Sequence, residues 1–259
     1  NLSSLDLPTN ITELARALKF DPDLIFECVH NNIEWLQTFG SQKGAAGALI
    51  DGCGNAFDQS ELMVLMLRAS GYQADFQFGE LELSENDASS WFGTTNIFAS
   101  SNLLASGGIP NETFWTGTEW RIRFSHVWVV VNISGTSYVF DPARKSYTSI
   151  SGIDLESAMG FNESTFLSQS LVGATVNANY VEDVNRGNLR NKLADYNNNL
   201  RSWIQANKSG ADISEILGTR KITPVTGIVR QTALPYIRPG TTPTTWTSIP
   251  DTYKATLRV

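Results

Sequence analysis

The stretch from Asp51 to Gly71 constrains the fold more than any other part of this sequence. A glycine-broken loop that carries Cys53 leads straight into apolar residues at helical spacing, and the helical pattern stops at Gly71. At the first turn of such a helix the backbone N–H groups have no partner within the helix, so they stabilise an anion and acidify a thiol. The sequence therefore predicts a helix over residues 55–70 whose first turn borders a reactive site.

Two further patterns predict an antiparallel sheet beside this helix. Apolar and polar residues alternate over 73–83, which indicates a strand with a bulge or bend at Gly79. Residues 120–132 and 137–142 read as the two strands of a hairpin. Counted back from the hairpin turn, His126 and Asp141 lie roughly opposite each other, so we expect contact between their side chains.

The rest of the chain predicts more helices and a C-terminal region with little regular structure. Short helices near residues 10–18 and from 22 on precede the reactive stretch. Cys28 falls on the apolar stripe of the second helix, and His30 lies off that stripe, so we expect His30 at the surface or at the end of the helix. Beyond the hairpin the sequence predicts further helices and then a Pro- and Thr-rich extended segment. We therefore predict a core domain at 1–150 and, packed on it, a helical and Pro/Thr-rich extension at 151–259.

Composition limits the classes of function. The chain has 259 residues, of which 41% are hydrophobic and 17% charged, as in ordinary globular proteins. The net charge of -7 argues against a nucleic-acid partner, and no apolar run approaches the ~18 residues of a membrane span. With only two cysteines and two histidines, the chain predicts neither a disulfide scaffold nor a His-rich metal site, and we expect no cofactor.

A cysteine followed by a histidine and an aspartate is the order of residues in a thiol-based catalytic site. The histidine takes the proton of the thiol, and the aspartate fixes the tautomer and orientation of the imidazole. His126 and Asp141 fit the last two roles, and Cys53 is the cysteine nearest to a helix start.

The motifs around these residues resemble the bacterial transglutaminase-like superfamily, which has a papain-like core. The helix end "LMLRASGY" (65–72), the strand "SHVWVVV" (125–131) and "YVFDPARKSY" (138–147) are similar to its core helix, its histidine strand and its strand ending in Asp-Pro. This resemblance implies an α+β fold in which a helix bundle packs on a small antiparallel sheet. It also implies acyl transfer or hydrolysis at an amide, with His126 as the base and Asp141 as the residue that orients it.

The same resemblance places the nucleophile at Ala56. In the family the cysteine stands two residues before a helix aspartate and twelve before an arginine, and both Asp58 and Arg68 point to position 56. Three explanations remain open: an introduced Cys→Ala replacement, a natural loss of the thiol, or a loop that lets Cys53 supply the sulfur. The first helical turn favours position 56, because Cys53 between two glycines would be poorly aimed.

Two alternatives to thiol chemistry also stay open. The cleft could bind a peptide or glycan without catalysis, or Asp58, His126 and Asp141 could perform acid–base chemistry on a carbohydrate. We expect a peptide, protein or glycan substrate and further domains in the same polypeptide. A chain that begins at Asn1 and is rich in Asn, Ser and Thr fits a piece of a larger exported protein, secreted or held at the cell surface or in the periplasm.

Overall fold

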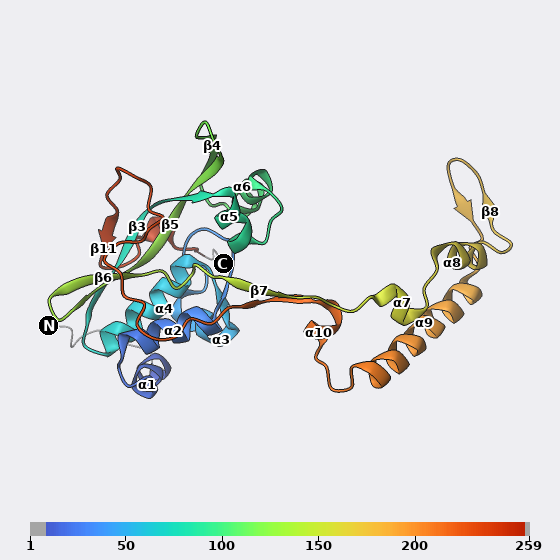
Figure 1. Cartoon of the computed structure of the whole chain (residues 1–259), viewed down its shortest axis with the longest axis horizontal. Helices are drawn as coiled ribbons and strands as arrows, with labels where there is room; N and C mark the ends of the chain where they lie inside the picture. The colour runs from blue at the N-terminus through green and yellow to red at the C-terminus, as the bar shows by residue number, and fades with distance from the viewer. Residues whose placement is uncertain (1–8, 257–259) are drawn as a thin grey trace. The chain divides into compact units, whose positions relative to one another are not determined.

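A computed structural model describes residues 9–256, which form two compact units (Figure 1). Of the described residues, the first unit comprises 9–147 together with 222–256, and the second comprises 148–221. The segment from 222 on is called the return segment below. The division into domains at 1–150 and 151–259 stays a prediction.

The first unit holds the predicted helices and sheet. Its helices are α1 (Thr9–Ala17), α2 (Pro22–Asn32), α3 (Gly44–Asp51), α4 (Ala56–Ala69), α5 (Glu85–Phe92), α6 (Ile97–Ser106) and the 3-10 helix η1 (Asp251–Tyr253). Its strands are β1 (Glu34–Trp35), β2 (Cys53–Gly54), β3 (Gln73–Ser84), β4 (Asn111–Trp115), β5 (Trp120–Ile133), β6 (Thr136–Phe140) and β11 (Thr244–Trp246). This mixture confirms the α+β class, with helices packed on an antiparallel sheet.

The sheet is organised around β3 and β5. Its strand order is β11-β3-β5-β4, and β6 also pairs with β5, beyond the part of β5 that pairs with β4. Strand β4 has no counterpart among the predicted strands. No bulge interrupts β3 at Gly79, which pairs with His126 in an unbroken antiparallel register. The glycine instead makes room for an aromatic ring, since a Cβ at this position would lie 3.1 Å from the ring of Trp128.

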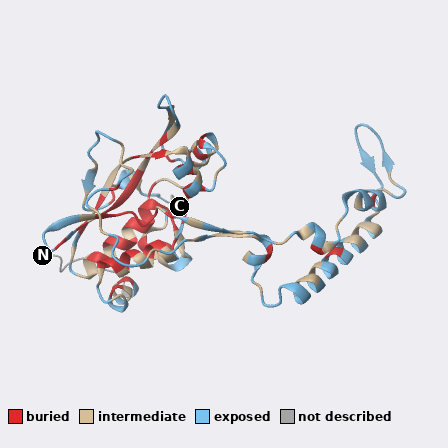
Figure 2. Ribbon diagram, in the orientation of Figure 1, coloured by how far each residue is buried: buried red, intermediate tan, exposed pale blue. Residues whose placement is uncertain are grey.

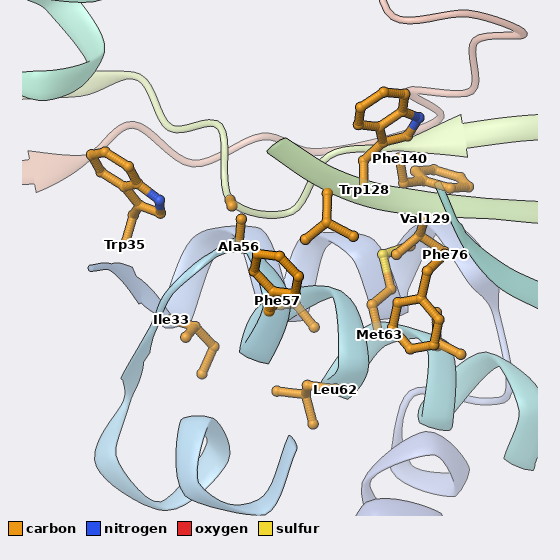
Figure 3. Close-up of a cluster of buried hydrophobic side chains, with 14 of the residues drawn as sticks. Ile33, Trp35, Ala56, Phe57, Leu62, Met63, Phe76, Trp128, Val129 and Phe140 are labelled. Atoms are coloured by element: carbon orange, nitrogen blue, oxygen red, sulfur yellow. The ribbon is translucent and has the colours of Figure 1, made fainter. Parts of the chain in front are cut away.

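The core lies between α4 and the sheet. Figure 2 shows α4 as mostly buried, and its side chains Phe57, Leu62 and Met63 are at most 2% exposed. Figure 3 shows Met63 beside Val129 of β5. This packing fixes α4 against the strand that carries His126.

The return segment covers the free edge of β3. Residues 244–246 pair with 76–78, and Ile237 forms an isolated bridge with Leu81. An uncovered edge would present unpaired N–H and C=O groups, so the return segment completes the sheet.

The second unit is mainly helical and poorly buried. Its elements are β7 (Tyr147–Ile150), α7 (Leu155–Met159), α8 (Glu163–Ser170), β8 (Thr175–Val176), β9 (Val181–Glu182), α9 (Arg186–Asn207), α10 (Ile213–Leu217) and β10 (Thr219–Ile222). Strand β7 pairs with β10, and β8 pairs with β9. Tyr196 is buried on α9, where its ring meets Phe161 and Phe166. Among the described residues, no helix has the length and apolar content that a membrane crossing needs.

Candidate active site

The start of α4 is fixed by reciprocal capping. The side chain of Asn55 accepts the Asp58 N–H at 3.1 Å, and Asp58 Oδ2 accepts the Asn55 N–H at 3.4 Å. This capping box satisfies two backbone donors and sets the first helical residue at Ala56. Gly54 allows a close approach just before the helix, because a Cβ there would lie 3.0 Å from the Cβ atoms of both Ala48 and Asp58.

The contacts between α4 and β5 indicate which part of the strand lies beside Ala56. One turn further along the helix, the Ser60 hydroxyl donates to the Val127 carbonyl at 3.4 Å. Residues four apart share a helix face, so the Ala56 methyl group faces the sheet as Ser60 does. Because Met63, further along α4, lies beside Val129, the helix and β5 run in the same direction. The four residues from Ser60 back to Ala56 rise about 6 Å, or about two strand residues, so we expect Ala56 to be level with residues 125–126 of β5.

Asp58 has a structural use for its carboxylate. Its Oδ1 accepts the backbone N–H groups of Gln42, Lys43 and Gly44 at 3.0, 3.1 and 2.9 Å. The side chain is 1% exposed, so these donors replace water. The interactions tie the loop before α3 to the first turn of α4 and leave Asp58 little access to a substrate, which weakens the carbohydrate alternative.

His126 and Asp141 form a buried pair. Nε2 of His126 lies 3.0 and 3.1 Å from the two carboxylate oxygens, and the two residues are 3% and 5% exposed. An ionised carboxylate only accepts, so Nε2 carries the hydrogen and the lone pair of the neutral imidazole lies on Nδ1. This tautomer, assigned from the hydrogen bonds, is the one in which Nδ1 takes a proton from a nucleophile.

The strand register makes this contact diagonal. Val129 pairs with Phe140, so the residue directly opposite Asp141 would be Trp128, two positions after His126. Both side chains lie on the same sheet face, and a histidine is long enough to reach a diagonal neighbour. The predicted contact is therefore present, although the two residues are not directly opposite.

The Asp141 carboxylate accepts several donors. Oδ1 accepts the N–H groups of Ala143 and Arg144, each at 3.2 Å, and Oδ2 accepts the Tyr236 hydroxyl at 3.1 Å. Burial by itself would raise the pKa of Asp141, but the charge and hydrogen bond of His126, with Tyr236 and Arg144, hold that pKa below its ordinary value. Asp141 is therefore an anion that can stabilise a protonated His126.

Cys53 is not in a free loop. It forms β2, which pairs in parallel with β1 opposite Glu34. Its Sγ accepts a hydrogen bond from Lys43 Nζ at 3.2 Å, and the same ammonium lies 2.6 Å from Asp51. The Cys53 sulfur therefore contacts Lys43. Within residues 9–256, no hydrogen bond joins Cys53 to His126.

Aromatic rings enclose the histidine. Trp91 of α5 meets the His126 ring edge-to-face at a centroid distance of 5.5 Å, and Trp128 stacks on it at 6.4 Å. Trp35 packs on Trp91 at 5.1 Å, and Figure 3 shows the Trp35 indole nitrogen on the side of the ring nearer Ala56. These rings exclude water from the pair and strengthen its electrostatic interactions.

A second polar cluster lies behind Asp141. His30 lies in the last turn of α2, as one of the two predicted places has it, but it is not at the surface: it is 4% exposed, and its Nε2 contacts the Arg144 carbonyl at 3.0 Å. Lys145, 2% exposed, donates from Nζ to the His30 carbonyl at 2.6 Å and caps the end of α2. A cavity of about 250 Å³ beside Asp141 is lined by residues of α2, the end of β6 and the return segment. Among residues 9–256, no group of His, Cys, Asp or Glu side chains is arranged to hold a metal.

The sequence did not predict that Tyr236 and Arg144 belong to this site. Tyr236 lies 95 residues from Asp141 in the chain, in a segment for which the sequence predicts only an extended conformation. The Arg144 guanidinium lies 4.4 Å above the centre of the Tyr236 ring. No periodicity or local spacing links these residues, so only the tertiary structure shows them together.

Comparison with known proteins identifies the family. The model of the transglutaminase-like superfamily matches residues 6–142, more than half of the chain, and the chain belongs to this superfamily. The match ends just after Asp141 and does not include the return segment. No curated protein and no solved structure matched the chain.

Proposed function

We propose that this chain carries the site of a transglutaminase-like acyl transferase or amide hydrolase, with position 56 as the nucleophile position. The observation that carries the proposal is the buried His126–Asp141 pair, whose proton-accepting Nδ1 is set by the carboxylate on Nε2. A general base of this kind serves a nucleophile at the adjacent helix start. Membership of the superfamily supports the same reaction class.

In the chain as written, Ala56 supplies no nucleophile. With a thiol at position 56, His126 would take its proton, and the thiolate would attack an amide carbonyl. The resulting thioester would pass to water or to an amine. The Ala56 N–H lies in the first turn of α4, where backbone donors stabilise a developing oxyanion. The Trp35 indole, whose nitrogen is on the side nearer Ala56, would add a second donor. With Ala56 the chain binds an amide-bearing peptide or protein and does not form a thioester.

The test is to restore the thiol. The Ala56→Cys substitution is made in a Cys53→Ser background and offered a glutamine-containing peptide and a primary amine. We expect an acyl adduct on position 56 by intact mass when the amine is left out, and incorporation of the amine into the peptide when it is present, with release of ammonia in both cases. The same protein with His126→Gln is the matched control and should form little adduct. If the thiol at 56 forms no more adduct than the His126→Gln control, the proposed function is wrong.

A further inference from the structure

The return segment delivers one hydroxyl to the buried anion of the site. The Tyr236 hydroxyl donates to Asp141 Oδ2 at 3.1 Å. Among the described residues, His126 and Tyr236 are the two side chains that donate a hydrogen bond to Asp141. Oδ1 is already held by two backbone N–H groups, while Oδ2 has only the His126 ring and this hydroxyl. Removing the hydroxyl therefore changes one of the two carboxylate oxygens that the imidazole contacts.

Backbone interactions hold Tyr236 in place. The Glu82 N–H donates to the Tyr236 carbonyl at 2.8 Å, and the Arg238 N–H donates to the Glu80 carbonyl at 2.9 Å. The bridge between Ile237 and Leu81 lies between these two bonds. Further back in the segment, the Val139 N–H donates to the Gln231 carbonyl at 2.8 Å. The segment is thus attached on both β3 and β6, on either side of the site.

The surroundings of Tyr236 keep it a donor. Burial and the negative charge of Asp141 raise the pKa of Tyr236 well above its ordinary value. The Arg144 guanidinium, stacked 4.4 Å above the ring centre, withdraws electron density and favours donation. Arg144 is itself oriented by its position over Tyr236 and by Asp87, whose carboxylate lies 3.7 Å away.

We propose that Tyr236 is a positioning residue that completes a His126–Asp141–Tyr236 relay, so that the return segment is part of the active site. This inference rests on the proposed function for its role in catalysis. It also states that residues 6–142, which the family model matches, do not by themselves form the complete site of this chain.

The first test uses the protein as it is and does not depend on activity. The Nε2–H proton of His126 is observed by NMR in the parent, in Tyr236→Phe and in Tyr253→Phe; with only two histidines, a His30→Gln variant assigns the signal. Tyr253 is the matched control, because it lies in the same return segment and packs among the rings of Phe57, Phe78 and Trp246. Loss of the Tyr236 hydroxyl leaves the Asp141 carboxylate more basic. A more basic carboxylate accepts a stronger hydrogen bond from His126 Nε2–H.

We therefore expect the Tyr236→Phe signal to move downfield, or to disappear through faster exchange, while the Tyr253→Phe signal stays at the parent position. A Tyr236→Phe signal at the parent position would overturn the inference, and so would an equal change in both variants.

The second test measures the role in catalysis. In an Ala56→Cys, Cys53→Ser background, we expect Tyr236→Phe to change the rate of thiol alkylation near neutral pH about three- to tenfold and to shift its pH profile, because the altered carboxylate changes how readily His126 holds a proton. Tyr253→Phe should leave both unchanged. An unchanged rate and profile in Tyr236→Phe would contradict the role. If the thiol at 56 is unreactive in every variant, the proposed function fails, whereas the NMR comparison still decides whether Tyr236 positions the pair.

Discussion

Asp58 and Asp141 are both buried carboxylates, at the start of α4 and just after the end of β6. Asp58 is bound mainly by backbone N–H groups of residues 42–44, whereas Asp141 also binds two titratable side chains, His126 and Tyr236. A carboxylate held by backbone donors fixes the path of the chain. A carboxylate held by an imidazole and a phenol also controls where a proton sits. Burial alone therefore does not distinguish the two aspartates, but the chemical type of their donors does, and in the proposed function only Asp141 takes part in catalysis.

The largest effect on stability is expected at Asp58. Asp58→Ala leaves three backbone N–H groups of the 42–44 loop without their acceptor, so we predict that the free energy of unfolding falls by about 3 kcal/mol or more in urea denaturation. Asp58→Asn keeps one carbonyl acceptor and should lose less. A loss of unfolding free energy below about 1 kcal/mol in Asp58→Ala would contradict the structural role assigned to Asp58, and with it the difference drawn between the two aspartates.

The next effect concerns Lys145, beside the Asp141 region. Burial lowers the pKa of Lys145 to about 7, although Asp141 and Glu34 act in the opposite direction. An unfolded lysine titrates near 10.4, so above pH 7 the unfolded state binds more protons and stability rises with pH, by at most about 1.4 kcal/mol per unit from this group.

Lys145→Met removes this contribution. Between pH 7 and pH 9 we expect the parent to gain about 2 kcal/mol more unfolding free energy than the variant. The check is urea denaturation of both proteins at the two pH values. Equal changes would show that Lys145 is charged in the folded protein.

A smaller, acid-dependent effect is expected at Asp141. Because its folded pKa lies below the ordinary value, the group stabilises the fold above its unfolded pKa of about 3.9 and loses this contribution as the pH falls through the folded pKa. In Asp141→Asn this part of the acid sensitivity should vanish, with a loss of about 1–2 kcal/mol at neutral pH. Acid unfolding followed by circular dichroism tests it, and an acid transition equally steep in both proteins would contradict it.

The smallest effect is expected at Cys53. Its thiol accepts from Lys43, which is also paired with Asp51, so Cys53→Ser should change the unfolding free energy by no more than about 0.5 kcal/mol. Thermal denaturation of the variant measures this. A large loss would give Cys53 a structural role that the described contacts do not contain.

The sequence predicted the parts of this molecule that depend on local signals. The start of α4 follows from Asn55 and Asp58, and the β5–β6 hairpin follows from alternation around a Ser134-Gly135 turn. The His126–Asp141 contact follows from that hairpin, because the strands bring both residues to one sheet face.

The rest depends on contacts between distant segments. The buried His30 contacts the carbonyl of Arg144, more than a hundred residues later, and the space left by Gly79 is taken by the ring of Trp128, which lies on another strand. Tyr236 reaches Asp141 only because the return segment pairs with β3. Single-sequence patterns carry no signal for such contacts.

The most direct test of the central claim compares two thiols within one molecule. In the Ala56→Cys variant, with Cys53 retained, iodoacetamide labelling at positions 56 and 53 is followed by peptide mass spectrometry from pH 5 to pH 9. We predict that position 56 reacts at least about tenfold faster than Cys53 near pH 6, and that His126→Gln abolishes the difference. Equal rates, faster labelling of Cys53, or an excess at position 56 that survives His126→Gln would contradict the assignment of position 56 as the nucleophile position served by His126.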